Sequence, residues 1–458
     1  MTNQSILPPM NERVWDIVIL GATGDAGMAI ATYVAGNCDT YTKAGSKPFR
    51  WAIAGRSVDK LERLRSRIMA GCDKPSTNDE IGILRSDVGV ARDMSELAKS
   101  TRVLLSAVGP YTVLGERVFL ACVEQGTNYV DITGEVDWVG SMREKYKEQA
   151  GISGSTLCSF AGFDCVPCDM TMYLARKALS ECDGKNAIIT GLETVSYAPN
   201  GVFPRGTIRT MLAKLPEGST FVGKLVRYAG SEGGVHWKTA LALARWLLPK
   251  WSPEYGAFTL PHFMGWCNIP VIYKSHDSSL DCTFHDRLAV PNSKGCLGTG
   301  YGLLQTVLVY LVLLVIAPYF LLLQIVIFFA PSTAKLLLRY FDSLQYRGNS
   351  NSRQKQMDNS AIDIWSYTKS SSGSKATVHL HVEGDAGIKA TALLAGETTF
   401  SMLELLDKNK LPKGLIGSPS EIVGDTLLER LRDEETIGRS CTLTVMVVEK
   451  GSAEKKED

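Results

Sequence analysis

The chain has 458 residues, of which 45% are hydrophobic, and its 49 basic side chains almost balance its 48 acidic ones. The length allows two or three domains, and the charge balance gives no support for a nucleic-acid partner bound through a basic excess. Eleven scattered cysteines, preceded by no apolar secretory segment, predict reduced thiols in a reducing compartment.

A strand, a glycine turn and a helix open the chain. The apolar run Trp15 to Leu20 predicts a parallel strand buried on both faces, and glycines then recur at the spacing GxxGxxG before a helix-compatible stretch. In such a turn the first glycine permits the bend, the second lets the backbone approach a pyrophosphate, and the third lets the helix pack on the strand. Free N–H groups of the helix N-terminus would face the phosphates. The motif predicts a dinucleotide site, with a ligand-free glycine turn as the alternative, and its predicted contacts are Gly21, Ala22, Thr23, Gly24 and Gly27.

The second strand, Arg50 to Ala54, is followed by Gly55, Arg56 and Ser57. In a dinucleotide-binding fold this position meets the adenosine ribose, and sites for NAD usually carry an acid here. Because Arg56 offers instead a planar cation that can pair with a 2′-phosphate, we expect NADP(H) as the cofactor. In the alternative, Arg56 is a solvated residue beside the helix cap Ser57.

The following segments continue the alternation of strands and helices expected of a doubly wound sheet. The expected strands are 81–84, 103–108, 129–133 and 156–160, and the expected helices are 58–70, 91–99, 115–125 and 139–150. Because the carboxyl ends of parallel strands line the ligand crevice, residues after these strands are further candidate cofactor contacts. They are Asp87, for which a turn role is equally compatible, and Ser106, Gly109 and Tyr111.

Five blocks carry a resemblance to a known family: GATGDAG, WAIAGRS, SAVGPYTVLGE, ACVEQGTNYVDITGE and AGFDCVPCD. In this order and spacing they resemble saccharopine dehydrogenase-like oxidoreductases, and mycobacterial trans-acting enoyl reductases are similar in the same blocks. The resemblance covers residues 15–175 and weakens beyond them. It implies a Rossmann domain, a second α/β domain with a mixed sheet, and use of NADP(H). It also implies that Gly21, Gly24, Gly27 and Arg56 belong to the cofactor site, but it transfers no catalytic residue.

The predicted domains are a Rossmann domain over residues 1–169, a second domain formed by 170–294 and 335–458, and an apolar segment over 295–334 between those two parts. Helix 170–179 and strand 187–196 are expected to begin the second domain, and strands 377–383, 389–395 and 441–449 to complete its sheet. Arg205, in a loop before an expected helix 208–214, either clamps an anion or is merely exposed. Residues 221–285 hold four of the eight tryptophans with His236 and His262, which fits either a membrane interface or a domain core.

The apolar segment has no charged side chain between Gly295 and Ala334, and its dense part, Tyr301 to Phe329, is long enough to span a bilayer. Pro318 would break a straight helix, and basic residues flank both ends, so that both ends prefer the cytosolic face. A spanning helix would also separate strands of one sheet. We therefore expect a hairpin that enters one leaflet, followed by an interfacial helix over 336–346; a spanning helix and a buried core are the alternatives.

Two patterns suggest catalytic groups weakly. Cys165 and Cys168 form a CxxC without the βαβ setting of thioredoxin, and no second CxxC predicts zinc. Tyr173 and Lys177, with Ser159 upstream, match the spacing of short-chain dehydrogenases, although such a match is expected by chance. The catalytic group is thus not assigned, with Tyr111, Tyr173 and Lys177 as weak candidates.

Taken together, these features predict an NADPH-dependent oxidoreductase on the cytosolic face of a membrane or lipid droplet, with organelle membranes, including the mitochondrial one, left open. A hydrophobic ketone or enoyl substrate follows from that location alone. The expected partners are the lipid surface, this substrate and a second copy of the chain. A dinucleotide-binding scaffold without turnover is the alternative function, and a soluble amino-acid dehydrogenase with a buried apolar segment is a third.

Overall fold

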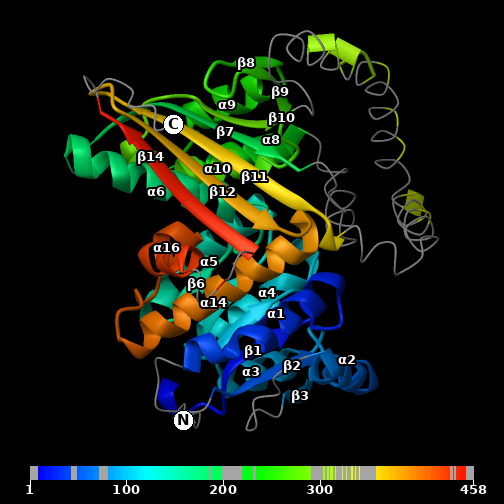
Figure 1. Ribbon diagram of the computed structural model, residues 1–458. Coiled ribbons are helices and arrows are strands. Elements are labelled where there is room, and N and C mark those ends of the chain that lie inside the picture. The colour runs from blue at the N-terminus through cyan, green and yellow to red at the C-terminus, as the bar shows by residue number, and fades with distance from the viewer. Residues whose placement is uncertain are drawn as a thin grey trace. The chain divides into compact units, whose positions relative to one another are not determined.

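The computed structural model divides into two compact units. The first unit comprises residues 1–166 and 387–438, and the second comprises 167–386 and 439–458. The residues described are 9–42, 49–71, 81–184, 187–198, 219–230, 234–289, 357–433, 437 and 440–449, together with isolated positions between 303 and 340. Figure 1 traces the elements of each unit along the chain.

The first unit is built on a seven-stranded, wholly parallel sheet in the order β13-β6-β5-β4-β1-β2-β3. The predicted Rossmann arrangement is therefore confirmed, with the short strand β13 added at one edge. Its elements are β1 (Trp15–Leu20), α1 (Asp25–Thr42), β2 (Trp51–Gly55), α2 (Val58–Gly71), β3 (Gly82–Arg85), α3 (Ala91–Ser100), β4 (Thr101–Ser106), α4 (Tyr111–Glu124), β5 (Asn128–Asp131), α5 (Val136–Ser153), β6 (Leu157–Cys158), α14 (Thr391–Asp407), β13 (Ile416–Gly417), α15 (Pro419–Ile422) and α16 (Gly424–Arg432).

The core of this unit follows from the apolar composition of its central strands. Ile17, Val18 and Ile19 of β1 are fully buried, as are Val103 to Leu105 of β4 beside them. Strands that are apolar at every position require cover on both faces, and helices supply it. In this unit α1 lies against α14, whereas α3, α4 and α5 contact one another in sequence order (Figure 1).

Residues 387–438 correct two predictions. They belong to the first unit, whereas the sequence placed all of 335–458 in the second domain. The expected strand 389–395 is wrong, because this stretch leaves a π-helical turn, Ala386–Ala390, and enters helix α14. A short apolar run does not distinguish a buried strand from a buried helix. Here the run continues as a long buried helix, which the first unit requires as cover for α1 and β4.

The second unit contains a seven-stranded mixed sheet in the order β14-β12-β11-β7-β10-β9-β8. Strand β7 pairs parallel with β10 and antiparallel with β11, and the other neighbours are antiparallel. The predicted mixed sheet is thus confirmed, including strands β12 and β14 after the apolar segment. Its elements are α6 (Val166–Asp183), β7 (Ile189–Tyr197), α8 (Ser219–Ala229), α9 (Trp237–Trp246), β8 (Lys250–Ser252), β9 (Ala257–Pro261), α10 (Gly265–His276), β10 (Phe284–Ala289), β11 (Ala361–Ser370), β12 (Lys375–Glu383) and β14 (Cys441–Val448).

No helix among the described residues is long and apolar enough to cross a membrane. The predicted hairpin at Pro318, the loop with Arg205, the helix 208–214 and most of the interfacial helix 336–346 lie outside those residues. The described positions between 303 and 340 are helical. Most of them carry exposed apolar side chains, such as Leu304, Leu308, Leu311 and Val315.

Candidate functional site: the carboxyl edge of the parallel sheet

The glycine turn after β1 has the geometry that its spacing predicts. Gly21 has a φ of 83°, and a Cβ there would stand 2.7 Å from Cγ2 of Val108. A Cβ on Gly27 would lie 2.2 Å from the carbonyl oxygen of Gly21 and 2.8 Å from its carbonyl carbon. Real Cβ atoms do not approach backbone so closely, so both positions require glycine. These contacts bring the first turn of α1 directly onto the end of β1.

Gly24 differs from the other two glycines because the space around it is open. It is exposed, and the only neighbour of a Cβ there would be the Gly21 oxygen at 3.4 Å. Its N–H donates to that same oxygen over 3.0 Å, which closes the turn immediately before α1 begins at Asp25. An uncovered backbone at a helix N-terminus is the cradle that a pyrophosphate needs, so the turn fits a dinucleotide. Ala22 is buried and Thr23 is half-buried beside it.

Arg56 stands at the carboxyl end of β2, the strand next to β1 in the sheet. Its side chain is exposed, and no hydrogen bond or ion pair joins it to another described residue. The Ser57 carbonyl accepts from Leu61 N over 3.2 Å, so Ser57 lies at the start of α2 as predicted. The guanidinium is therefore available to an anion at the sheet edge.

Asp87 forms a turn. Its Oδ1 accepts from the N–H of Gly89 over 2.9 Å, and its own N–H donates to the Asp93 carboxylate over 2.9 Å. These bonds order the entry to α3, which is the turn role that the sequence left open. They occupy one oxygen of the Asp87 carboxylate.

The segment after β4 holds Ser106, Gly109 and Tyr111. The Ser106 side-chain oxygen is buried and has no partner among the described residues. The Tyr111 hydroxyl donates to the Ser106 carbonyl over 2.8 Å, and burial, with the nearby Asp131 carboxylate, raises its pKa well above the usual range. The raised pKa makes the Tyr111 hydroxyl a poorer proton donor, which weakens Tyr111 as a candidate acid. Gly109 precedes Pro110, the residue before α4.

Glu135 is a structural residue of this edge that carries no signature in the sequence. Its carboxylate is buried and accepts from Tyr111 N at 2.6 Å, Thr112 N at 2.9 Å and the Thr112 hydroxyl at 2.7 Å. It therefore satisfies the free N–H groups at the start of α4. This cap explains why α4 begins at Tyr111, four residues before the predicted start.

Asp131, at the end of β5, was also missed. Its buried carboxylate accepts from Thr133 N (3.0 Å), Phe160 N (3.2 Å) and the Ser159 hydroxyl (2.9 Å). Phe160 has a φ of 68°, a conformation that non-glycine residues rarely adopt and that these contacts hold in place. Burial raises the pKa of Asp131 to about 7, against the opposing effect of its hydrogen bonds. The carboxyl edge of the sheet thus holds a carboxyl group that titrates near neutrality.

The two catalytic patterns receive no support from their surroundings. Cys165 and Cys168 are buried free thiols, and burial, followed by the Asp286 carboxylate, raises the pKa of Cys168 well above its usual range. A protonated thiol of this kind is a poor nucleophile. The Ser159 hydroxyl is bonded to Asp131 in the first unit, whereas Tyr173 and Lys177 lie on α6 in the second. Tyr173 packs beneath the Arg176 guanidinium, 5.7 Å from the ring centre.

Comparison with known proteins agrees with this geometry. Residues 17–158 match the saccharopine dehydrogenase NADP binding domain family. The saccharopine dehydrogenase-like oxidoreductase of Bos taurus is 33% identical over 42% of this chain, and that match spans 43% of its own length. A lipid droplet localized protein of Caenorhabditis elegans is 30% identical over 45% of this chain and 46% of that protein. These matches therefore span less than half of either relative.

Two similarities extend over nearly the whole chain. A putative trans-acting enoyl reductase of Mycobacterium tuberculosis is 28% identical over 92% of this chain and 96% of its own length. The structure of saccharopine dehydrogenase (L-Glu forming) from Saccharomyces cerevisiae covers 95% of this chain, and all of that chain is matched, with a TM-score of 0.51 and 12% identity; this likeness concerns the fold alone. Residues 17–158 are thus similar to the saccharopine dehydrogenase NADP binding domain, which supports NADP(H) as the cofactor, and the predicted resemblance to saccharopine dehydrogenase-like oxidoreductases is confirmed.

Proposed function

We propose that the protein is an NADP(H)-dependent oxidoreductase that works at a lipid surface on a hydrophobic carbonyl or enoyl substrate. The observation that carries the proposal is the glycine turn, in which two sterically enforced glycines flank one whose backbone is open. When bound there, the dinucleotide supplies hydride chemistry. The chain's own groups hold it: the N–H groups at the start of α1 face the pyrophosphate, and Arg56 pairs with the 2′-phosphate.

Three observations support the lipid surface. Residues 295–334 carry no charge, and the described apolar side chains between 303 and 326 are exposed in helical conformation. A relative from Caenorhabditis elegans bears the name lipid droplet localized protein.

The Mycobacterium tuberculosis relative, which matches along most of this chain, bears the name of a putative enoyl reductase, which favours an enoyl group as one substrate to test.

The cofactor part of the proposal is tested by titrating detergent-purified protein with NADPH and NADH while nicotinamide fluorescence is followed. We expect tighter binding of NADPH, and a loss of about 10- to 100-fold in Arg56→Ala for NADPH alone, since a charge-assisted contact is removed. Arg63→Ala, an exposed arginine on α2, is the matched control and should bind as the wild type does. Equal affinities for both cofactors in the wild type would contradict the assignment of Arg56.

A second function, a dinucleotide-binding scaffold on a lipid surface, is favoured by one observation. The hydroxyl of Tyr111, one of the weak catalytic candidates, donates to the Ser106 carbonyl, and burial raises its pKa well above the usual range, so that it is a poor proton donor. Oxidation of NADPH in the presence of vesicles that carry ketone or enoyl lipids separates the two functions. Turnover supports the enzyme, whereas tight NADPH binding without turnover on either lipid class supports the scaffold.

A further inference from the structure

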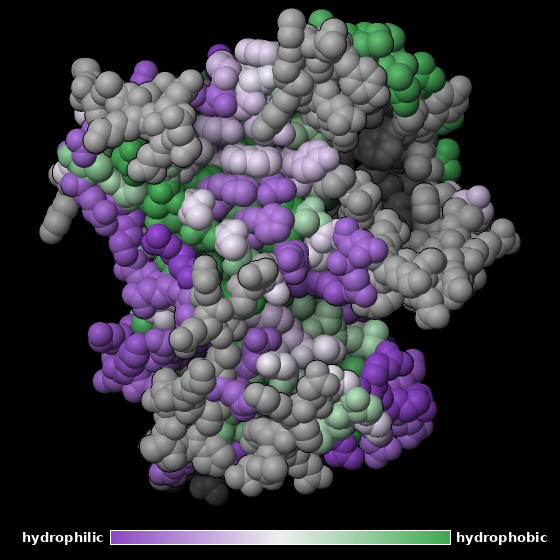
Figure 2. Space-filling view, in the orientation of Figure 1, coloured by the Kyte–Doolittle hydropathy of each residue, from purple (hydrophilic) through white to green (hydrophobic). Residues whose placement is uncertain are grey.

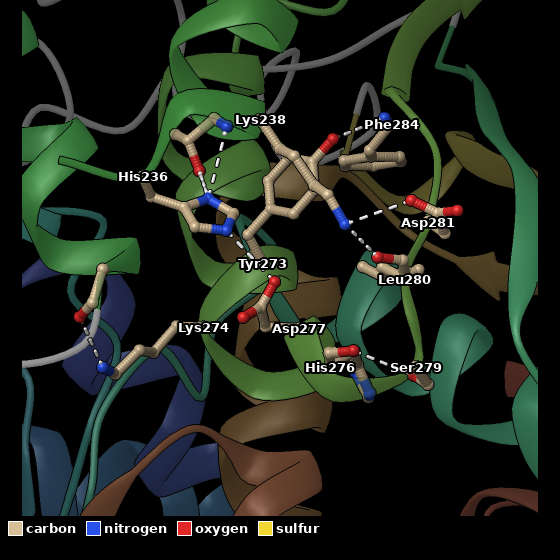
Figure 3. Close-up of polar contacts among 12 residues, drawn as sticks. His236, Lys238, Tyr273, Lys274, His276, Asp277, Ser279, Leu280, Asp281 and Phe284 are labelled. Carbon is tan, nitrogen blue, oxygen red and sulfur yellow. Dashed lines mark hydrogen bonds and ion pairs between the residues drawn. The ribbon is translucent and has the colours of Figure 1, made fainter. Parts of the chain in front are cut away.

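Helix α9 is fixed to the second unit by polar contacts on its inner side (Figure 3). His236 precedes the helix, and its Nδ1 accepts from Thr239 N over 3.3 Å while its Nε2 faces Asp277 Oδ1 at 3.1 Å. The ring lies 5.1 Å from that of Tyr273 on α10. Lys238 donates to the Leu280 carbonyl over 2.6 Å. The start of α9 is therefore held by three residues of the segment 273–280, which are Tyr273, Asp277 and Leu280.

The outer side of α9 is apolar although it faces solvent. Trp237, Leu241 and Ala244 recur at intervals of four and three residues and so lie on one face of α9, where Leu241 is half-buried. Leu248 follows just beyond the end of the helix at Trp246. Trp237 is 63% exposed and Leu248 60%, whereas Thr239 and Ala242 on the other side are buried. Within the helix the only charges are the cations Lys238 and Arg245. An exposed apolar stripe on a rigid helix marks an interaction surface.

The end of α9 presents a rigid apolar tip, Leu247 and Leu248, both about 60% exposed. The fully buried Arg287 on β10 donates to the Trp246 carbonyl over 2.9 Å and to the Leu248 carbonyl over 2.8 Å. The Tyr310 hydroxyl donates to the Leu247 carbonyl over 2.7 Å. The tip therefore contacts Tyr310 of the uncharged segment 295–334. Figure 2 shows green, hydrophobic residues at the upper right of the view, where Figure 1 draws the helical positions that follow residue 300.

A basic pocket of about 450 Å³ lies beside the tip, lined in part by Arg245, Lys250, Lys369 and Lys375. Two acids line it as well: Glu193 pairs with Lys250 at 2.7 Å, and Glu254 pairs with Lys375 at 3.0 Å. The cations thus exceed the acids. At the pocket, burial and then the positive charges of Lys250, Arg287 and Arg245 lower the pKa of His285 to about 4.

We propose that α9 and its tip dock the second unit onto an anionic lipid surface. The stripe Trp237, Leu241 and Ala244, together with Leu248, enters the boundary between headgroups and acyl chains, and the basic pocket takes the phosphate of a headgroup. Tryptophan at such a boundary and cations beside it are the features that lipid surfaces select. Because the tip contacts Tyr310 of an uncharged segment of 40 residues, a lipid surface fits this site better than a protein partner does. The proposal rests on the lipid-surface location proposed above.

The test uses the full-length chain diluted from detergent into vesicles of phosphatidylcholine, with and without phosphatidylserine, in which the phosphatidylcholine acyl chains are brominated. Bromine quenches tryptophan only at close range. We expect the wild type to lose more fluorescence than Trp237→Phe, and the difference to grow when phosphatidylserine is present. Arg245→Ala/Lys369→Ala should weaken binding to the anionic vesicles by about fivefold for each cation removed and leave binding to neutral vesicles unchanged.

Two controls keep the outcomes separate. Ile152→Ala removes an even more exposed apolar side chain from the first unit and should change neither quenching nor binding. NADPH titration of each variant should match the wild type. If the wild type floats with vesicles but Trp237 is not quenched, the docking face is overturned and the lipid location stands. If the wild type does not float with vesicles, both the docking face and the lipid-surface location are overturned. If Trp237→Ala/Leu248→Ala changes only the oligomeric state, the face joins two copies and the proposal fails.

Discussion

The important residues of the two sheets differ in how far apart they lie along the chain. In the parallel sheet the important residues are glycines and strand ends that are close in sequence, such as Gly21 and Gly27 around one turn. In the mixed sheet the polar contacts join distant residues: His262 on one strand's end faces Asp286 at 3.0 Å, and Asp363 faces both His379 and His381 at 2.9 Å. A constraint on the backbone of one turn produces a residue spacing that can be recognised in the sequence, whereas a pair of side chains from separate strands produces none.

The largest expected effect concerns a buried cluster that joins α14, α16 and α1 within the first unit. Glu397 on α14 is buried and accepts from Arg430 Nε over 2.6 Å and from the Tyr33 hydroxyl over 2.8 Å. Removing the cation in Arg430→Ala leaves a buried carboxylate unpaired, which costs about 3–5 kcal/mol. We expect a loss of that size in the free energy of unfolding and, in consequence, a fall in NADPH binding at elevated temperature.

The control for Arg430→Ala is Arg432→Ala, which changes an exposed arginine on the same helix and should alter stability by less than about 0.5 kcal/mol. Denaturant unfolding followed by circular dichroism measures both. Equal stability of the two variants would show that the Glu397 cluster does not join α14 to the parallel sheet.

A second pair of variants sharpens the contrast between required and tolerated glycines within α1. Gly27→Ala places a Cβ 2.2 Å from the Gly21 oxygen, so we expect NADPH binding to be lost and stability to fall by about 1–3 kcal/mol. Gly36→Ala has no neighbour within 4 Å and should stabilise the helix by up to about 1 kcal/mol. Fluorescence titration and thermal unfolding of both give the answer, and retained binding in Gly27→Ala would refute the role given to the turn.

The last test concerns the pH dependence that Asp131 contributes. Its pKa rises from 3.8 to about 7 on folding, so the folded protein holds a proton that the unfolded chain has lost between about pH 4 and 7. The free energy of unfolding therefore falls as pH rises through this window, by about 4 kcal/mol at most. Asp131→Asn keeps an oxygen for the N–H groups of Thr133 and Phe160 and cannot ionise.

We expect Asp131→Asn to lack this part of the pH dependence, so that its stability relative to the wild type increases from pH 4 to pH 8. Urea unfolding at several pH values measures the difference between the two proteins, in which all other titrating groups cancel. A difference that stays constant with pH would mean that Asp131 is ionised throughout.

Much of the parallel sheet could be predicted because most of its strands are short apolar runs bounded by turn residues, and because the family resemblance implied a Rossmann domain. The glycine turn was predictable for a steric reason that acts within seven residues. Glu135 and Asp131 were not, because each is defined by the N–H groups it accepts from other segments. The start of helix α14 was mistaken for a strand because residues 392–395 form a short apolar run, and only the surface that the helix covers distinguishes the two.

The division of the chain has a consequence for synthesis on the ribosome. The parallel sheet cannot be completed when β6 emerges, because β13, which pairs with β6 at Ile416 and Gly417, and α14, which lies against α1, are made more than 200 residues later. Until then the nascent first unit exposes an unpaired strand edge and an uncovered apolar helix face, both of which promote aggregation. The second unit in turn waits for β14. Each unit is therefore completed only after most of the other has been synthesised, and its aggregation-prone surfaces stay exposed until then.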